Sequence, residues 1–115
     1  IKLRMKKKKD IFERYKNNLK NNSKIKFFKL QKNETPWSVD IYLKDVNKLK
    51  KILQKNKILK RYAYPPLNSQ KIYNNFKNLP VSNFYCNRGL WLPTSLDLKN
   101  LEIDKICKLI NKYIF

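Results

Sequence analysis

Apolar side chains near the C-terminal end of the chain recur at the spacing of an α-helix, and this pattern constrains the fold more than any other. They stand three, four, seven, ten and eleven positions after the first, at Ile103, Ile106, Cys107, Ile110, Tyr113 and Ile114. Because a helical turn takes about 3.6 residues, all of them lie on one side of a helix. The opposite side carries Lys105, Lys108 and Lys112. We expect Asp97 or Asn100 to cap this helix, whose apolar side must pack against the rest of a folded domain.

Three earlier segments also favour helices. Residues 2–19 carry an apolar stripe, which consists of Ile11, Phe12, Tyr15 and Leu19. Asp45 is a suitable N-cap for a second helix that extends to about residue 56. A short helix is expected near residues 81–87.

Four segments favour strands, because they are rich in β-branched and aromatic residues or alternate apolar with polar positions. They are residues 25–30, 36–43, 58–64 and 90–93, and the first two should pair as a hairpin. The pair Pro65-Pro66 ends the third strand, because proline cannot donate to a ladder. The element order α-β-β-α-β-(loop)-β-α predicts a single α+β domain over residues 1–115, in which helices cover one face of a small, mostly antiparallel sheet.

The net charge of +20 permits two interpretations. A strongly basic chain can bind nucleic acid through its phosphates, so a small basic nucleic-acid-binding module is the alternative function. However, only four of the 28 basic residues are arginine, and lysine, asparagine and isoleucine are all encoded by AT-rich codons. Arginine is the residue suited to bidentate phosphate binding. Codon bias therefore accounts better for the charge, and we do not expect specific nucleic-acid binding.

The composition excludes several kinds of active site. Histidine is absent, so no Ser-His-Asp or Cys-His arrangement can form, and Cys86 and Cys107 lack the spacing of a zinc site. The single glycine, Gly89, rules out a glycine-rich phosphate loop. We assign no catalytic, metal-binding or cofactor-binding residue to this chain. No apolar run approaches the roughly 20 residues of a membrane span, and no signal peptide is visible, so we expect a cytoplasmic protein without a membrane partner.

Two segments have the composition of a ligand pocket. Residues 61–73 combine aromatic rings, two prolines, an arginine, an asparagine and a glutamine, and residues 87–93 contain a second arginine and a tryptophan. In a chain that otherwise uses lysine, Arg61 and Arg88 indicate a need for the fork or the stacking plane of a guanidinium. Aromatic walls with a few polar groups suit a sugar or a nucleotide. The alternative, that these residues serve packing and surface ion pairs, is equally compatible with the sequence.

Several stretches resemble a known family. Residues 36–41, residues 58–73, and residues 88–96 followed by an amphipathic helix are similar, in order and spacing, to the C-terminal small domain of the DegT-type (DegT/DnrJ/StrS) aminotransferases, which depend on pyridoxal phosphate (PLP) and act on nucleotide sugars. The opening helix, with Arg14-Tyr15 and Leu19, resembles the helix by which that family enters its small domain.

The resemblance implies a fold type I PLP enzyme that works as a homodimer. Such enzymes transfer an amino group, usually from glutamate, to a keto sugar on a nucleotide, for example in surface polysaccharide synthesis. A large N-terminal domain of the same polypeptide would precede Ile1 and hold PLP and the lysine that forms a Schiff base with it, so this chain alone should be inactive. By their position in the family's pattern, the residues expected to contact the nucleotide-sugar substrate are Arg61, Tyr64, Asn68, Gln70, Tyr73 and Arg88.

Overall fold

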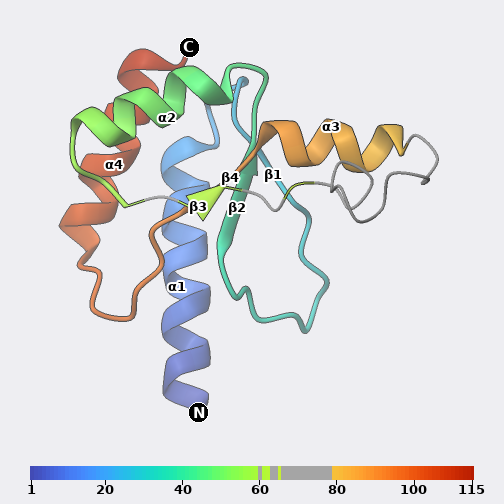
Figure 1. Cartoon of the computed structure of the whole chain (residues 1–115). Coiled ribbons are helices and arrows are strands. Elements are labelled where there is room, and N and C mark those ends of the chain that lie inside the picture. The colour runs from blue at the N-terminus through green and yellow to red at the C-terminus, as the bar shows by residue number, and fades with distance from the viewer. Residues whose placement is uncertain (60, 63–64, 66–78) are drawn as a thin grey trace.

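An antiparallel sheet lies at the centre of this computed structural model, which describes residues 1–59, 61–62, 65 and 79–115 (Figure 1). Within that part of the chain the sheet has four strands in the order β1-β2-β4-β3, and each neighbouring pair is antiparallel. The strands are β1 (Lys26–Phe27), β2 (Val39–Tyr42), β3 (Arg61–Tyr62) and β4 (Gly89–Leu92). The helices are α1 (Lys2–Leu19), α2 (Val46–Lys55), α3 (Pro80–Arg88) and α4 (Asn100–Tyr113). The expected α+β class, with a small antiparallel sheet and flanking helices, is confirmed.

Alternation along β2 gives the sheet one apolar face. Val39 and Ile41 are buried, whereas Asp40 and Tyr42 between and after them are half-buried and point to the other face. β4 pairs with β2 and contributes Leu90 and Leu92 to the apolar face, which α1, α2 and α4 cover. The largest side chains of this core that are fully buried are Tyr15, Leu19, Ile41, Leu49, Leu53, Leu90, Ile103 and Ile110.

The position of α3 differs from the expectation that the helices cover one face. Figure 1 shows α3 on the other side of β2 and β4 from α2 and α4. None of its residues is buried, and its Tyr85 ring contacts Tyr42, which points away from the core. Because α3 has no continuous apolar side, it cannot take part in the core and instead packs through aromatic rings on the opposite face.

Polar contacts join α1 to distant parts of the chain. Arg14 donates two hydrogen bonds to the Asp104 carboxylate on α4, from Nε at 2.9 Å and from Nη2 at 2.7 Å, and Asn18 donates a third at 2.8 Å. The Arg14 hydrogen bond is the main cause that holds the pKa of Asp104 below its usual value. The buried Tyr15 hydroxyl donates to the Pro93 carbonyl at 2.9 Å, and burial raises its pKa well above that of a free tyrosine. These contacts fix α1 against α4 and against the segment that leaves β4.

The observed helix boundaries agree with the sequence-based predictions more closely than the observed helix caps do. α1 has the expected bounds, and Pro80 lies in the first turn of α3, where proline has no helical hydrogen bond to lose. Neither Asp97 nor Asn100 caps α4: the cap position is Lys99, whose backbone N–H donates to the Glu102 carboxylate at 3.3 Å. Glu102 replaces the expected cap because a carboxylate three residues into a helix can reach back to its first free N–H.

β1 is shorter than its sequence pattern suggested, with two residues of the expected six. Among the described residues of the third expected strand, β3 forms two ladder positions. Both strands lie at the edges of the sheet, where one side of the backbone has no strand to pair with. β4 lies where the sequence predicted a strand at residues 90–93, and it is an interior strand that pairs on both sides.

Candidate functional site

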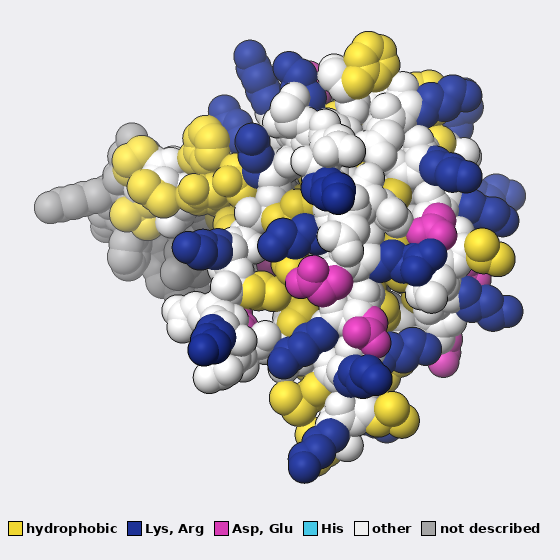
Figure 2. Space-filling view, turned by 180° about the vertical axis from the view of Figure 1, so that it is seen from behind, with side chains coloured by type: hydrophobic (Ala, Val, Ile, Leu, Met, Phe, Trp, Pro, Cys, Tyr) yellow, Lys and Arg dark blue, Asp and Glu magenta, His cyan; other side chains and the backbone are white. Residues whose placement is uncertain are grey.

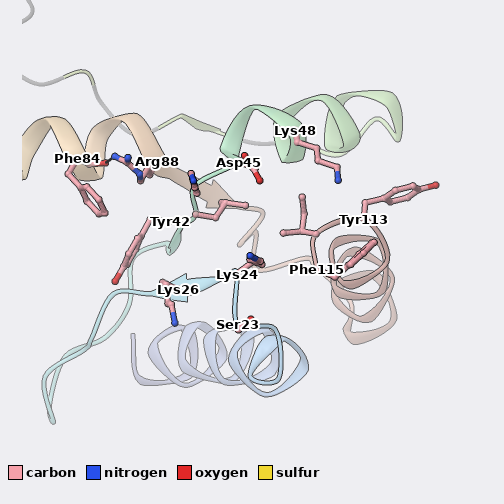
Figure 3. A pocket seen from close by; sticks show the side chains of 13 residues that line it. Ser23, Lys24, Lys26, Tyr42, Asp45, Lys48, Phe84, Arg88, Tyr113 and Phe115 are labelled. Atoms are coloured by element: carbon pink, nitrogen blue, oxygen red, sulfur yellow. Dashed lines mark hydrogen bonds between the residues drawn. The ribbon is translucent and has the colours of Figure 1, made fainter.

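A pocket of about 470 Å³ lies between α3, the start of α2 and the C-terminal end of the chain (Figure 3). We call it the α3 pocket. Its lining residues come from five parts of the fold and are Ser23, Lys24, Lys26, Tyr42, Leu43, Lys44, Asp45, Lys48, Phe84, Arg88, Tyr113, Ile114 and Phe115. Five of them are basic and one is acidic, so the pocket is strongly cationic.

Arg88 enters this pocket from the last turn of α3. Its guanidinium carbon lies 4.0 Å from the centroid of the Phe84 ring, and Nη1 donates to the Phe84 carbonyl at 3.2 Å. Both contacts follow from a spacing of four residues, which places side chains one turn apart on the same side of a helix. A cation at a helix C-terminus also meets the negative end of the helix dipole. The planar guanidinium group therefore holds the Arg88 side chain in one position, and a lysine side chain has no such planar group.

Aromatic rings that meet at tilted and edge-to-face angles hold α3 on the sheet. Tyr85 contacts Tyr42 at 5.1 Å and Phe28 at 5.4 Å between ring centroids, and Phe28 and Tyr42 contact each other at 5.0 Å. Tyr42 pairs with Gly89 across the ladder, and a glycine there leaves space above the strand for the rings. The cluster thereby positions the last turn of α3 at the rim of the α3 pocket.

Arg61 lies in a different place. It pairs with Trp91 across the ladder and borders a second pocket, of about 460 Å³, together with Trp37 and Leu59. Trp37 and Leu59 are each 85% exposed. No residue lines both this pocket and the α3 pocket, so the structure does not bring Arg61 and Arg88 into one cavity. The other expected substrate contacts lie outside the described residues: Tyr64, Asn68, Gln70 and Tyr73.

On the face of the molecule that Figure 2 shows, the basic residues are not gathered into one patch. Figure 2 shows lysine and arginine spread over the whole visible face, with hydrophobic and acidic side chains between them. A nucleic-acid-binding module instead gathers its cations on one face or along one helix. This distribution matches the codon-bias interpretation of the charge.

The comparisons with known proteins identify a family. Residues 1–111 match the sequence profile of the DegT/DnrJ/EryC1/StrS aminotransferase family. The chain belongs to this family. A search of curated proteins finds no match.

Solved structures agree with the family. An aminotransferase of the same family from Brucella abortus is 28% identical and has a TM-score of 0.85 over 96% of this chain. At 20% identity, PseC from Helicobacter pylori, an aminotransferase involved in the biosynthesis of pseudoaminic acid, shows the same fold, with a TM-score of 0.83 over 96% of this chain. The chain covers 31% and 32% of these two proteins, so it spans about a third of the length of its solved relatives.

The described residues do not fit the PLP that the family uses. A lysine that binds a carbonyl compound covalently is activated by an enclosed or desolvated site. In the part of the chain that the structure describes, no charged side chain is buried. We therefore derive no chemical step through PLP from these residues. Among them, too, there is no group of three potential metal ligands, and none of their helices is long and apolar enough to cross a membrane.

Sequence reasoning missed the lysines of the α3 pocket. Lys24 precedes β1 and Lys48 belongs to the first turn of α2, and the side chains of both point into the pocket in Figure 3. Lysine occurs throughout this chain, so no local pattern separates these two from the others. Arg88 could be singled out because arginine is rare here.

Proposed function

We propose that this chain is the C-terminal small domain of a PLP-dependent aminotransferase that transfers an amino group, with glutamate as donor, to a nucleotide-linked keto sugar. The observation that carries the proposal is the family match over residues 1–111, which the fold similarity to the Brucella abortus aminotransferase supports. PseC acts in the biosynthesis of pseudoaminic acid, which supports a role in making an amino sugar for a surface polysaccharide.

In this proposal the large N-terminal domain supplies PLP and its lysine, and two copies of the whole polypeptide form a cytoplasmic homodimer. PLP, when bound there, provides the electron sink for amino transfer. The small domain contributes substrate contacts rather than chemistry. Arg61 and Arg88 are the described residues proposed for this role, because a guanidinium can meet the charge of a diphosphate. The proposal also retains Tyr64, Asn68, Gln70 and Tyr73 as substrate contacts.

The test begins with the coding DNA upstream of Ile1. We expect it to encode a PLP domain in the same reading frame, and a start codon directly before Ile1 with no such domain would overturn the proposal. The complete protein should then show the visible absorption of protein-bound PLP and convert nucleotide keto sugars with glutamate. Arg61→Ala should raise KM for the nucleotide sugar. The exposed Lys32→Ala, on the β1–β2 connection, serves as the control and should leave KM unchanged.

A further inference from the structure

Both tryptophans of the chain lie at one end of the sheet, where they line the second pocket of about 460 Å³. Trp37 precedes β2 and Trp91 belongs to β4. Leu59 lines the same pocket, and it and Trp37 are each 85% exposed. A cluster of large apolar side chains left in water marks an interaction surface, and tryptophan is the residue most enriched in the contacts that hold interfaces together. This end of the sheet therefore has the composition of an interface.

The helix α3 packs at the other end of this sheet face. Its Tyr85 ring contacts Tyr42 at the end of β2, whereas Trp37 stands before the start of that strand. Trp91 pairs with Asp40, which lies on the same face of the sheet as Tyr42 but two positions nearer to Trp37. The aromatic cluster that seats α3 is thus centred on the end of the face away from Trp37.

The first half of α1 is poorly supported by the rest of the domain. None of residues 1–10 is buried, and Figure 1 shows the first turns of the helix extending beyond the sheet and the other helices. The first turn contains no acidic residue, and Lys2 and Arg4 place positive charge at the positive end of the helix dipole. A helical segment of this length is only marginally stable alone in water. These turns therefore need a surface on which to pack.

One side of α1 connects its unsupported half with the tryptophan end of the sheet. Ile1, Met5 and Lys8 are spaced by four and three residues, so they lie along the same side of the helix. Lys8 lines the second pocket together with Trp37, and its ammonium group donates to the Thr94 carbonyl at 2.6 Å. Ile1 and Met5 are exposed. We call the surface that these apolar side chains form the tryptophan face, which consists of Ile1, Met5, Trp37, Leu59 and Trp91.

The surroundings of the tryptophan face are basic. Lys8 and Arg61 line the pocket, no carboxylate is among the described residues that line it, and Lys2 and Arg4 flank the apolar positions of α1. An apolar centre with charged residues around it is the usual anatomy of a protein interface. A covering surface that carries carboxylates complements these cations. The chain spans about a third of the length of its solved relatives, so the same polypeptide can supply such a surface.

We propose that the tryptophan face is the docking surface for the large domain of the same polypeptide, which covers it with apolar side chains and carboxylates. The proposal rests on the proposed function, which supplies that domain. Trp37 and Leu59 form the centre of this contact, and Ile1 and Met5 extend it along α1. The contact stabilises the first turns of α1 and fixes the orientation of the small domain through both α1 and the sheet.

Hydroxyl-radical footprinting tests this docking by comparing the 115-residue chain with the complete protein that the upstream DNA encodes. Both are diluted until sedimentation shows the isolated chain to be a monomer, and mass spectrometry locates the labels. Trp37 and Leu59 should be labelled on the order of fivefold less in the complete protein, because side chains at the centre of an interface lose contact with water. Leu101 and Phe115, which are 72% and 87% exposed and lie outside the tryptophan face, should keep their labelling.

A pair of matched variants of the complete protein gives a second readout. Trp37→Ser/Leu59→Ser should raise the labelling of Met5 to its value in the isolated chain, because the large domain then no longer covers the first turns of α1. Leu101→Ser/Phe115→Ser removes two equally exposed apolar side chains from elsewhere and should leave Met5 protected. Equal labelling of Met5 in the two variants would overturn the proposal.

Other outcomes separate this docking from its alternatives. Equal labelling of Trp37 and Leu59 in the isolated chain and the complete protein would overturn it. Protection that disappears when the complete protein is diluted to its monomer would assign the face to a second copy and overturn it as well. Bound PLP and amino transfer, measured on the same sample, report the proposed function separately. An active protein with fully labelled Trp37 contradicts the docking alone, whereas the lack of an upstream domain contradicts both.

Discussion

The hydrogen bond from Tyr15 to Pro93 offers a quantitative test of how α1 is attached. The Tyr15 side chain is fully buried, and its hydroxyl donates at 2.9 Å to a carbonyl 78 positions along the chain. Tyr15→Phe removes the hydroxyl and keeps the ring, so the apolar packing of α1 is preserved. The change in free energy of unfolding therefore reports the hydrogen bond rather than a cavity.

The expected loss follows from the burial of the two partners. A hydrogen bond contributes about 0.5–1.5 kcal/mol net, and a fully buried carbonyl left without a donor costs about 1–3 kcal/mol. Because Pro93 is half-buried, we expect a loss near the lower end, about 1 kcal/mol. That corresponds to a decrease in Tm of about 4 °C for a domain of this size. Tyr15→Ala also deletes the ring from the core and should cost about 3–5 kcal/mol.

The assay is urea unfolding followed by circular dichroism, at two protein concentrations. We expect the midpoint of Tyr15→Phe to fall with an unchanged m value, since the area exposed on unfolding does not change. Tyr113→Phe is the control, because Tyr113 is 40% exposed and its loss of a hydroxyl should stay within about 0.5 kcal/mol. The reasoning is refuted if the two variants lose the same stability, or if Tyr15→Phe loses as much as Tyr15→Ala.

Three further outcomes are expected. Since the pKa of Asp104 is lowered in the folded state, its contribution to stability is complete above its unfolded pKa of about 3.9 and is lost as the pH falls through the lower folded value. Asp104→Asn should therefore destabilise the protein at neutral pH, and its unfolding midpoint should fall less than that of the wild type as the pH is lowered. Parallel curves of midpoint against pH for the two proteins would contradict this. Burial raises the pKa of the Cys107 thiol to about 11, so at pH 8 a thiol reagent should label half-buried Cys86 first and Cys107 only at the rate of unfolding, as mass spectrometry would show. The exposed side chains of Trp37 and Leu59 should make the isolated chain self-associate, and sedimentation should show less association for W37S/L59S than for the wild type, whereas a monodisperse wild-type monomer would refute it.

The sequence specified the local elements because their signals are local. The apolar stripe at Ile11, Phe12, Tyr15 and Leu19 predicted the bounds and the buried side of α1, and all four residues are in the core. The hairpin of β1 and β2 also followed from two neighbouring extended segments. Caps were less predictable, because several polar residues stand near each helix start and only the backbone geometry selects one.

The order of strands could not be read from the chain. β4 was expected as a strand, but its sequence does not show that it inserts between β2 and β3 and so becomes an interior strand. Such pairing depends on which faces remain apolar once the helices are packed, and no local pattern records it. The same holds for the position of α3. Its aromatic Tyr85 packs on Tyr42, which β2 places on the face of the sheet away from the core.

For the site, the sequence by itself showed that Arg88 is one of few arginines in a lysine-rich chain. It also showed that the chain resembles one enzyme family. Tertiary structure alone decided that Arg61 and Arg88 border different pockets, and that Lys24 and Lys48 face each other across one of them. The physical reason is that a charge acts over several ångströms in space, whatever its distance along the chain. Residues 24 and 48 become neighbours because the β1–β2 hairpin returns the chain to the start of α2 beside the segment that precedes β1.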